Sequence, residues 1–595
     1  MSSSPSVVVI GGGVAGLTAA HELAERGFRV DVYEARPAWG GKARSQPVAA
    51  TATAGRRELP GEHGFRFYPR FYRHVIDTMR RIPRPGGGVV ADELRATTEA
   101  AIALIDNTTW FRFFHRSIAK PYDIVSALEL FFADLGFDNA DVGMFGAKIL
   151  QFFTSSGQRR VGEYEQMSWW EFLEARACSA QFQRQLRAVP RMMVAMDAQR
   201  GSANTVGTIS MQLLLDYATT GVNNDRTLAG PTTELWIEPW LAHLEQLHVG
   251  LHAGAVAVRL DVNGDHIAGV ALADGSRVTG DYYVLAVPIE AAIPLLSPEL
   301  AALDPQLAVL AHKKPDELVS WMSGIQFYLY EDVPIVRGHV FYPDSPWALT
   351  SISQAQFWRD RGLFRKRYGD GETGGCLSVD ISEWDTPGTF VPKRAKDCTP
   401  AEIEREVWCQ LKAALNGSHE GEQILSDDLK HSWHLDDDLE FVAAGGIVNH
   451  SRLLVHPPGS WQYRPSAGTA LPNLVLAADY VRTQTNIASM EGANEAARLA
   501  VNVIVQRSGS SANACALWPL VEPERFDAWK ALDRRLYEHG KKHLFELMGI
   551  RQAAQAMDVL RRFSAFTGLA KLDELLDEVK ASSIIRGLLD RLGVS

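Results

Sequence analysis

The feature that most constrains this fold is residues 7–20, where a buried strand meets a glycine-rich turn and a helix. Residues 7–10 are an unbroken β-branched run, which is typical of a strand buried on both faces. Gly11, Gly13 and Gly16 follow at the G-x-G-x-x-G spacing. The helix expected after them directs its amide N–H groups and the positive end of its dipole toward the turn. This arrangement predicts a binding site for a pyrophosphate.

A second strand, residues 28–34, ends in Glu34. Glu34 lies roughly 20 residues after the glycines, where a carboxylate accepts a hydrogen bond from a ribose 2′-hydroxyl in dinucleotide-binding units. In such units Gly11 permits the tight turn, Gly13 lets the pyrophosphate approach the backbone, and Gly16 lets the helix pack on the strand. A glycine turn without a ligand would not explain Glu34. The first 34 residues therefore predict a dinucleotide-binding unit.

The residues just beyond Glu34 indicate which dinucleotide is bound. Gly40 and Gly41 form a second glycine pair, and Arg44 follows three residues later. Here the sequence resembles the flavin-dependent amine oxidase and phytoene desaturase superfamily, in which a segment E-(x)n-G-G-(x)2-R wraps FAD. The resemblance implies that Gly40 and Gly41 lie against FAD and that Arg44 helps to hold its diphosphate. An NAD enzyme has no use for this second element.

A second match to the superfamily lies near the other end of the chain. Residues 472–480 read as a strand that runs into Asp479, and residues 489–497 open a helix. They resemble the terminal motif N-L-(x)2-A-G-D and its G-A-containing helix, except that Ala478 stands where the family has Gly. The resemblance implies that Asp479 holds the ribityl–phosphate region and that the helix N-terminus stabilises the negative charge of reduced flavin. The residues assigned to the cofactor on this helix are Met490, Glu491 and Gly492.

The middle of the chain returns to the same domain. Residues 255–260 and 267–272 predict a β-hairpin with its turn at residues 262–265. By resemblance, Val256 meets the adenine through its backbone. FAD is expected to be bound non-covalently, because no obvious Cys or His tethering motif is present.

A polar-His-aromatic segment at residues 61–69 follows the first flavin motif. On the phytoene desaturase side of the superfamily, such a segment runs close to the flavin ring. The resemblance implies that His63 lies beside the isoalloxazine, with Glu62 next to it. An imidazole can take up a proton near neutral pH, so His63 and Glu62 are the predicted catalytic residues. The alternative is that His63 is a buried, hydrogen-bonded structural residue.

The chain as a whole predicts an α/β protein, with a two-part FAD-binding domain of the Rossmann-like, glutathione-reductase type and an inserted substrate domain of mixed sheet and helices. Residues 46–60 are expected to be a loop, and strands are expected at residues 325–330, 338–342 and 347–352. The aromatic and methionine clusters of the helical insert are either core or the lining for a lipophilic substrate. The expected parts are FAD-binding segments at 1–69, 236–300 and 461–507, a mostly helical insert at 70–235, a strand-rich substrate domain at 301–460 and a helical C-terminal extension at 515–595.

Composition excludes several other classes of protein. The net charge of −11, from 60 basic and 71 acidic residues, argues against nucleic acid as the main partner. Five scattered cysteines without C-x-x-C spacing favour a reducing, cytoplasmic setting with neither disulfides nor a metal site. No apolar run reaches the ~18 residues of a membrane span. The C-terminal helices are expected to pack on the body or on a second subunit, and peripheral membrane contact is the minor alternative.

These features predict an FAD-dependent oxidoreductase. We expect a desaturase or dehydrogenase that passes a hydride from a small hydrophobic, isoprenoid- or carotenoid-like substrate to flavin N5. One alternative is a flavin amine oxidase, in which a Lys is often held to N5 through water. Lys313 and Lys314 are the lysines that precede the second strand region, and neither can be placed at the flavin. The other alternative is a flavin-dependent isomerase with no net redox change.

Overall fold

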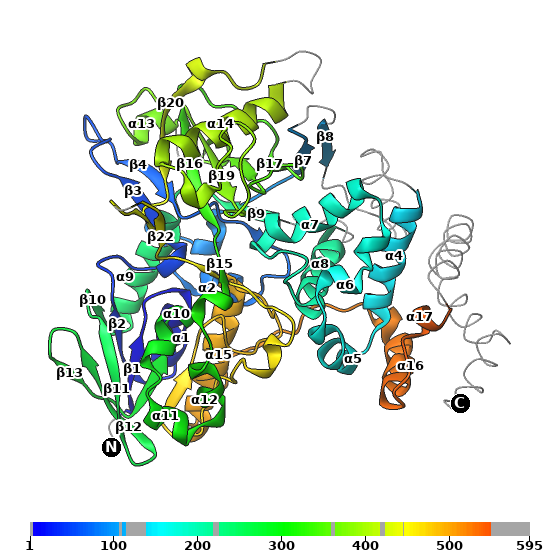
Figure 1. Cartoon of the computed structure of the whole chain (residues 1–595). Coiled ribbons are helices and arrows are strands. Elements are labelled where there is room, and N and C mark those ends of the chain that lie inside the picture. Colours follow the sequence, from blue (N-terminus) through cyan, green and yellow to red (C-terminus); the bar gives the residue numbers. More distant parts are fainter. Residues whose placement is uncertain are drawn as a thin grey trace.

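A five-stranded parallel sheet contains the predicted nucleotide-binding unit and lies in the lower part of Figure 1. The computed structural model describes residues 4–105, 110–114, 139–217, 225–358, 363–416, 423–443 and 445–548. Strands from the start, middle and end of the chain pair side by side in this sheet, which confirms the predicted α/β fold with a woven first domain. The strands, in spatial order, are β10 (Gly250–Ala253), β2 (Arg29–Glu34), β1 (Ser6–Ile10), β14 (Tyr282–Leu285) and β24 (Leu474–Leu476).

Helices cover this sheet because the strands are apolar on both faces. Val9 and Val32 are fully buried, and so is Leu17 on α1 (Val14–Glu25). The long helix α15 (Met490–Arg507) lies beside α1, where the Asn494 side chain donates a hydrogen bond to Thr18 Oγ1 at 2.9 Å. The other helices of this domain are α2 (His74–Arg81), α9 (Glu238–Gln246), α10 (Ile289–Leu295), α11 (Pro298–Leu303) and α12 (Pro305–Ala311).

The predicted hairpin forms a small antiparallel sheet at the lower left of Figure 1. It consists of β11 (Ala257–Asn263), β12 (His266–Leu272) and the short β13 (Arg277–Val278). The turn between the first two strands lies where the sequence places it, because Asn263 pairs with His266.

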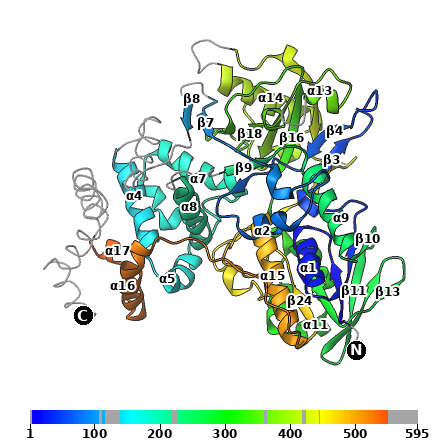
Figure 2. The same ribbon diagram turned by 180° about the vertical axis from the view of Figure 1, so that it is seen from behind.

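A seven-stranded sheet forms the upper domain and is covered by α14 (Pro400–Asn416) (Figures 1 and 2). Its neighbours are antiparallel except for one parallel pair, β17 with β7. The expected strand at 347–352 begins only at Thr350, because Ala348 is left-handed (φ 48°) and closes a turn. In spatial order the strands are β20 (Lys430–Leu435), β16 (Ser323–Leu329), β19 (Gly375–Ile381), β18 (Thr350–Ser353), β17 (Gly338–Phe341), β7 (Glu99–Ala103) and β8 (Trp110–Phe114).

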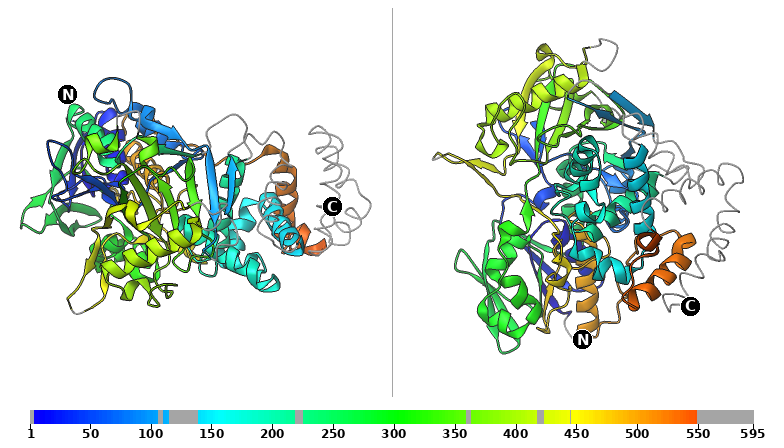
Figure 3. Two further views of the ribbon diagram at one scale, coloured as in Figure 1. Left: turned by 90° about the horizontal axis from the view of Figure 1, so that it is seen from above. Right: turned by 45° about the vertical axis from the view of Figure 1, so that its right-hand side comes forward.

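A helical lobe stands beside these two domains, and the C-terminal helices α16 (Asp527–Glu538) and α17 (Leu544–Met548) pack against it (Figure 3). A buried ion pair of 2.7 Å between Arg159 and Asp533 joins α16 to the lobe. Ser168 caps α6: its Oγ accepts from the Glu171 amide at 3.2 Å, and the Glu171 carboxylate accepts from the Ser168 amide at 2.9 Å. The helices of the lobe are α4 (Asn139–Thr154), α5 (Gly157–Gly162), α6 (Trp169–Phe172), α7 (Ala180–Val194) and α8 (Ala203–Tyr217).

Two parts of the chain differ from what the sequence predicts. The two ends of the predicted loop at 46–60 are paired strands, because β3 (Ser45–Val48) pairs with β4 (Leu59–Glu62); Pro47 and Pro60 face each other there and conceal the strand pattern. The insert expected to be mostly helical also supplies β7 and β8 to the upper sheet. The remaining short elements are β5 (Tyr68–Pro69), β6 (Leu94–Ala96), β9 (Asp225–Leu228), α13 (Phe364–Arg367), β15 (Val319–Ser320), β21 (Leu439–Phe441), β22 (Ile447–Asn449) and β23 (Leu453–Leu454).

The aromatic cluster at 130–132 and the apolar faces at 575–589 lie outside the described residues. Across the parts of the chain that the structure describes, none of the helices combines the length and the apolar character needed to cross a bilayer.

Candidate functional site

The first glycine turn has the shape that a pyrophosphate site requires. Gly11 has a φ of 107°, which favours glycine, and it turns the chain directly after β1. A Cβ on Gly16 would lie 1.8 Å from the Gly11 carbonyl oxygen, so only glycine lets α1 pack this closely on the strand. A Cβ on Gly13 would meet only the Cα of Gly41, at 3.8 Å. The backbone at Gly13 is therefore open on the side that faces the second glycine pair.

The second glycine pair lies directly against the first turn. The Gly40 amide donates to the Gly12 carbonyl oxygen at 2.9 Å, and Gly40 and Gly13 form an isolated β-bridge. Gly40 and Gly41 both have positive φ, at 99° and 56°. The two glycine elements thus form one cradle, as the motif spacing predicts.

Glu34 lies at the end of β2 with its carboxylate held at this cradle. Its Oε2 accepts from the Gly12 amide at 2.6 Å, and its Oε1 accepts from the Arg36 amide at 2.9 Å. The residue is 7% exposed. Its backbone carbonyl accepts from Ala255, which places Val256 beside Glu34, as an adenosine site requires. Val256 itself is exposed, and its carbonyl accepts from the Ala273 amide.

Arg44 is fixed at the far side of the cradle. Its guanidinium donates to Asp438 at 2.6 Å and to the Gly41 carbonyl at 2.9 Å. Burial raises the pKa of Asp438, but hydrogen bonds from Arg44 and Ser451 outweigh this and hold it well below its usual value. Arg36 also pairs with Asp438, at 3.0 Å. Asp438 thus stays ionised and orients the arginine assigned to the diphosphate.

The C-terminal motif approaches the same edge of the sheet. Asp479 follows β24, which pairs with β14 and places it at the carboxyl end of the parallel strands, where ligands bind in open α/β sheets. Burial raises the pKa of Asp479, and the positive charge of Lys42 opposes that rise. Because Lys42 belongs to the second glycine turn, the two motifs converge in space. Ala478 is buried at the position where glycine was expected.

The N-terminus of α15 begins at Met490 and is capped by Ser489, whose Oγ accepts from the Gly492 amide at 3.0 Å. The Glu491 carboxylate turns away to the start of α2. It accepts from the amides of Arg73, His74 and Val75 and from the His74 ring, all between 2.7 and 2.9 Å. The side chain of Glu491 therefore anchors α2, and contact with a cofactor is left to the backbone of this helix turn.

Glu62 and His63 lie between the cradle and the upper sheet, and their side chains have different environments. The Glu62 carboxylate is 2% exposed and accepts from Ser45 Oγ at 2.8 Å and from the Thr232 amide at 2.9 Å. Burial raises its pKa. Glu62 is thus enclosed by protein donors. The His63 side chain is 11% exposed, and its carbonyl accepts from the amide of Gly324 on β16.

The structure adds Asp436, which the sequence analysis did not identify. Its Oδ2 lies 2.6 Å from His63 Nδ1. Burial alone would raise the pKa of Asp436, but the charge and hydrogen bond of His63 and the amide of Gln46 lower it below its usual value. Aromatic rings lie close by, since Phe65 and Phe67 each pack 5.2 Å from the ring of His339. The available signal was the run of three aspartates, 436–438, after a strand.

His63, Asp436 and Asp438 lie close enough together to hold a cation. The guanidinium groups of Arg36 and Arg44 already neutralise Asp438 and would repel one. The surrounding positive charge therefore does not favour a metal ion at this group.

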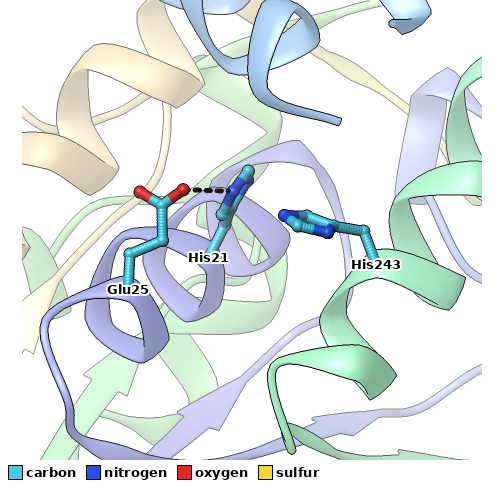
Figure 4. A group of neighbouring side chains, drawn as sticks. All are labelled: His21, Glu25 and His243. Atoms are coloured by element: carbon cyan, nitrogen blue, oxygen red, sulfur yellow. Dashed lines mark hydrogen bonds and ion pairs between the residues drawn. The ribbon is translucent and has the colours of Figure 1, made fainter. Parts of the chain in front are cut away.

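His21, Glu25 and His243 form a second such group at the junction of α1 and α9 (Figure 4). The indole N–H of Trp240 donates to His21 Nδ1 at 3.2 Å, so a neutral His21 ring carries its hydrogen on Nε2. That hydrogen points at Glu25, 3.0 Å away. His21 therefore offers no free lone pair to a metal, and the group is a structural link between the helices.

A cavity of about 800 Å³ lies between the helical lobe, the upper sheet and α10. Nine of the 23 residues that line it are charged, including Arg191, Glu290, Glu383 and Arg452. The ion pair between Arg191 and Glu383 spans one wall. Such a lining does not suit a lipophilic substrate, and we do not place the substrate there.

Comparison with known families agrees with this geometry. Residues 9–82 match the NAD(P)-binding Rossmann-like domain, which covers the first glycine turn and Glu34. Residues 152–505, more than half of the chain, match the flavin containing amine oxidoreductase family. The chain belongs to that family. It is a flavin-dependent oxidoreductase, and the predicted membership of the amine oxidase and phytoene desaturase superfamily is confirmed.

Sequence relatives of this flavin oxidoreductase match over a short stretch. The carotenoid phi-ring synthase of Streptomyces griseus is 39% identical over 79 residues, which is 13% of this chain and 15% of that protein. The carotenoid phi-ring synthase of Chlorobaculum tepidum is 40% identical over 73 residues, which is 12% of this chain and 11% of that protein. The chain thus spans less than a sixth of the length of either relative.

Solved structures share the fold over most of the chain. An oxidoreductase from Methanosarcina mazei aligns with a TM-score of 0.53 and 14% identity, over 84% of this chain and all of that chain. Cyclohexylamine oxidase from Brevibacterium oxydans aligns with a TM-score of 0.55 and 14% identity, over 85% of this chain and all of that chain. Putrescine oxidase bound to putrescine aligns with a TM-score of 0.53 and 14% identity, over 84% of this chain and 99% of that chain. At this identity the likeness concerns the fold.

The residues present fit a flavin dinucleotide. The glycine cradle is open at Gly13, the Glu34 carboxylate is held in place by two amides, and Arg44 is oriented by an ionised partner. When bound there, the flavin would supply the acceptor for a hydride. The chain contributes the binding and the placement of the groups around it.

Proposed function

We propose that this flavin oxidoreductase is a desaturase or dehydrogenase that removes two hydrogens from a lipophilic, isoprenoid- or carotenoid-like substrate. The observation that carries this proposal is the His63–Asp436 pair, which lies between the flavin cradle and β16 of the upper sheet. Carbon–carbon desaturation needs a group that takes up a proton after the hydride has left, and an imidazole serves this purpose near neutral pH.

The roles of the chain's own residues follow from their contacts. Gly13, Glu34 and Arg44 bind and orient FAD, with Val256 at the adenine and Asp479 at the ribityl region. His63 accepts the proton. Glu62, whose carboxylate is enclosed by Ser45 and Thr232, fixes the strand that carries His63. The N-terminal turn of α15, at Met490 and Gly492, directs the positive end of the helix dipole toward the flavin.

The surroundings of His63 support an apolar substrate. Phe65, Tyr328 and Ile352 belong to one buried apolar cluster next to His63, and Phe67 packs against it. The relatives named carotenoid phi-ring synthase lend further support, although they match only a short stretch.

Amine oxidation is the second candidate, because the matching family and two of the similar folds are named for amines. The positions of Lys42 and Lys313 argue against amine oxidation. Lys42 donates to the Arg452 carbonyl and lies 3.4 Å from Glu290. Lys313 lies over the Tyr463 ring at 3.9 Å. Neither is free to hold a water at the flavin.

Anaerobic bleaching of the bound flavin tests the proposal. The purified holoenzyme is mixed without oxygen with β-carotene, lycopene or squalene in detergent micelles, and in parallel with cyclohexylamine or putrescine. We expect the absorbance of oxidised flavin to fall with at least one of the hydrocarbons and to persist with the amines. Bleaching by the amines alone would assign the protein to amine oxidation instead.

We also propose that FAD is held without a covalent bond. Among the described residues, all five cysteines carry free thiols, and four of these are buried. Acid precipitation should therefore leave unmodified FAD in the supernatant. Flavin that stays in the pellet would contradict this.

A further inference from the structure

We propose that Asp436 is the positioning residue of the site, which holds His63 in the one ring tautomer that can accept a proton from substrate. This inference rests on the proposed function for the identity of the reaction. It adds a residue that lies 373 positions away from His63 in the sequence.

The backbones of both residues are fixed by the same residue of β16. The Gly324 amide donates to the His63 carbonyl at 2.6 Å, and the Gly324 carbonyl accepts from the Asp436 amide at 3.0 Å. A Cβ at Gly324 would lie 2.9 Å from the Glu62 carbonyl oxygen, so glycine permits this close approach. These backbone hydrogen bonds alone therefore hold the pair in a fixed geometry, independently of the contact between the two side chains.

The Asp436 carboxylate can act only as an acceptor toward His63. Its side chain is fully buried, and its Oδ1 accepts from the Gln46 amide group at 2.8 Å and from the Asp438 backbone amide at 3.0 Å. Its Oδ2 faces His63 Nδ1 at 2.6 Å. An ionised carboxylate has no hydrogen to give, so Nδ1 carries the ring hydrogen and the lone pair is on Nε2.

The exposed part of the His63 ring therefore lies away from Asp436. Asp436 covers Nδ1, and the side chain keeps 11% of its surface exposed. Nε2 thus acts as the base. A buried aspartate orients a histidine in the same way in hydrolytic triads. Here the histidine would take its proton from a C–H bond of the substrate.

In the proposed step, two C–H bonds on adjacent carbons of the substrate break and a C=C bond forms between these carbons. One hydrogen leaves with its electron pair to the family's flavin, and the other leaves as a proton to Nε2 of His63. Asp436 stays ionised throughout and stabilises the positive charge that His63 gains.

Asp380 is the rival base. It lies on β19, its Oδ1 accepts from the Phe65 amide at 3.3 Å, and burial raises its pKa to about 7. The positive charge of Arg66 opposes that rise in part. Asp380 therefore serves as the comparison in the experiment.

The decisive variant is Asp436→Asn, compared with Asp436→Ala and with Asp437→Asn as the matched control. Because Gln46 and Asp438 both donate to Oδ1, the new amide must keep its oxygen there and turn its NH2 group to His63. That NH2 would donate to Nδ1 and force the ring hydrogen onto Nε2. Asp437 is the next residue, and its side chain is 60% exposed.

The first readout does not depend on turnover. Histidine ring ¹⁵N chemical shifts are recorded on labelled holoenzyme, and His63 is assigned by the signal lost in His63→Gln. We expect hydrogen on Nδ1 in the wild type and in Asp437→Asn, and on Nε2 in Asp436→Asn. Hydrogen on Nε2 in the wild type would overturn the proposal.

The second readout is the rate of anaerobic flavin reduction by the hydrocarbon that bleaches the wild-type flavin. We expect Asp436→Asn to lower this rate by roughly 10²–10⁴-fold, with substrate affinity unchanged, and to be slower than Asp436→Ala. A merely structural role predicts the opposite order, because asparagine is the closer substitute. Equal rates in Asp436→Asn and wild type, or a loss seen only in Asp380→Asn, would overturn the proposal. If none of the three hydrocarbons reduces the wild type, the proposed function fails, and the ¹⁵N shifts still decide the role of Asp436.

Discussion

Replacing Glu34 by alanine should weaken FAD binding without unfolding the protein. The Glu34 carboxylate accepts hydrogen bonds from the amides of Gly12 and Arg36 at 2.6 and 2.9 Å, so its position at the cradle is fixed. A hydrogen bond to a charged group contributes about 1.5–3 kcal/mol. Since 1.4 kcal/mol is a factor of ten, the dissociation constant of FAD should rise about 10- to 150-fold.

The assay is a titration of apoprotein with FAD, followed by quenching of flavin fluorescence. Asp31→Asn is the control, because Asp31 lies on the same strand, is about half exposed and pairs with His252 on the surface. This control should bind FAD as the wild type does. Wild-type affinity in Glu34→Ala would show that Glu34 does not hold the ribose.

Three further substitutions, one of them with a matched control, probe the framework around the site. Gly16→Ala would place a methyl group 1.8 Å from a backbone oxygen, so we expect FAD content to collapse, whereas Gly157→Ala meets nothing within 4 Å and should leave the melting temperature equal or higher. Arg498→Met should lower the free energy of unfolding in urea by about 3 kcal/mol, because it removes a buried donor to the His74 carbonyl and to Thr78 Oγ1 as well as one ion-pair partner of Glu22; an unchanged midpoint would contradict this. Asp380→Asn tests pH dependence: burial raises the pKa of Asp380 to about 7, so the native wild type loses stability as pH rises from the unfolded value of about 4 to 7. The melting temperature of the variant should therefore rise relative to that of the wild type between pH 4 and pH 7 and level off above, and a difference that is constant over this range would refute the assignment.

The sequence predicted the parts of the fold that depend on local pattern. The β-branched run, the glycine spacing and Glu34 lie within one short stretch, and each reflects a backbone requirement that is visible in the residues themselves. The terminal motif around Asp479 was predicted for the same reason, and in the structure the positive charge of Lys42 lowers the pKa of Asp479 against the rise that burial causes.

The contacts that long-range folding creates could not be predicted. Asp436 reaches His63 only because β16 lies between their two segments, and three aspartates after a strand read as an exposed turn. The Glu491 side chain was assigned to the cofactor helix, yet it anchors α2, because the pairing depends on how two distant helices meet. The β3–β4 hairpin was read as a loop because each of its strands contains a proline. The pairing of the two strands is visible only in the structure.

The measurement that tests the central claim most directly is the product of a single anaerobic turnover. The bound flavin is reduced by a hydrocarbon from the bleaching panel, and the organic product is analysed by mass spectrometry. The account predicts one product molecule per flavin reduced, lighter than the substrate by two hydrogens, with no ammonia released. A product of unchanged mass, or reduction that occurs only with amines and releases ammonia, would contradict it.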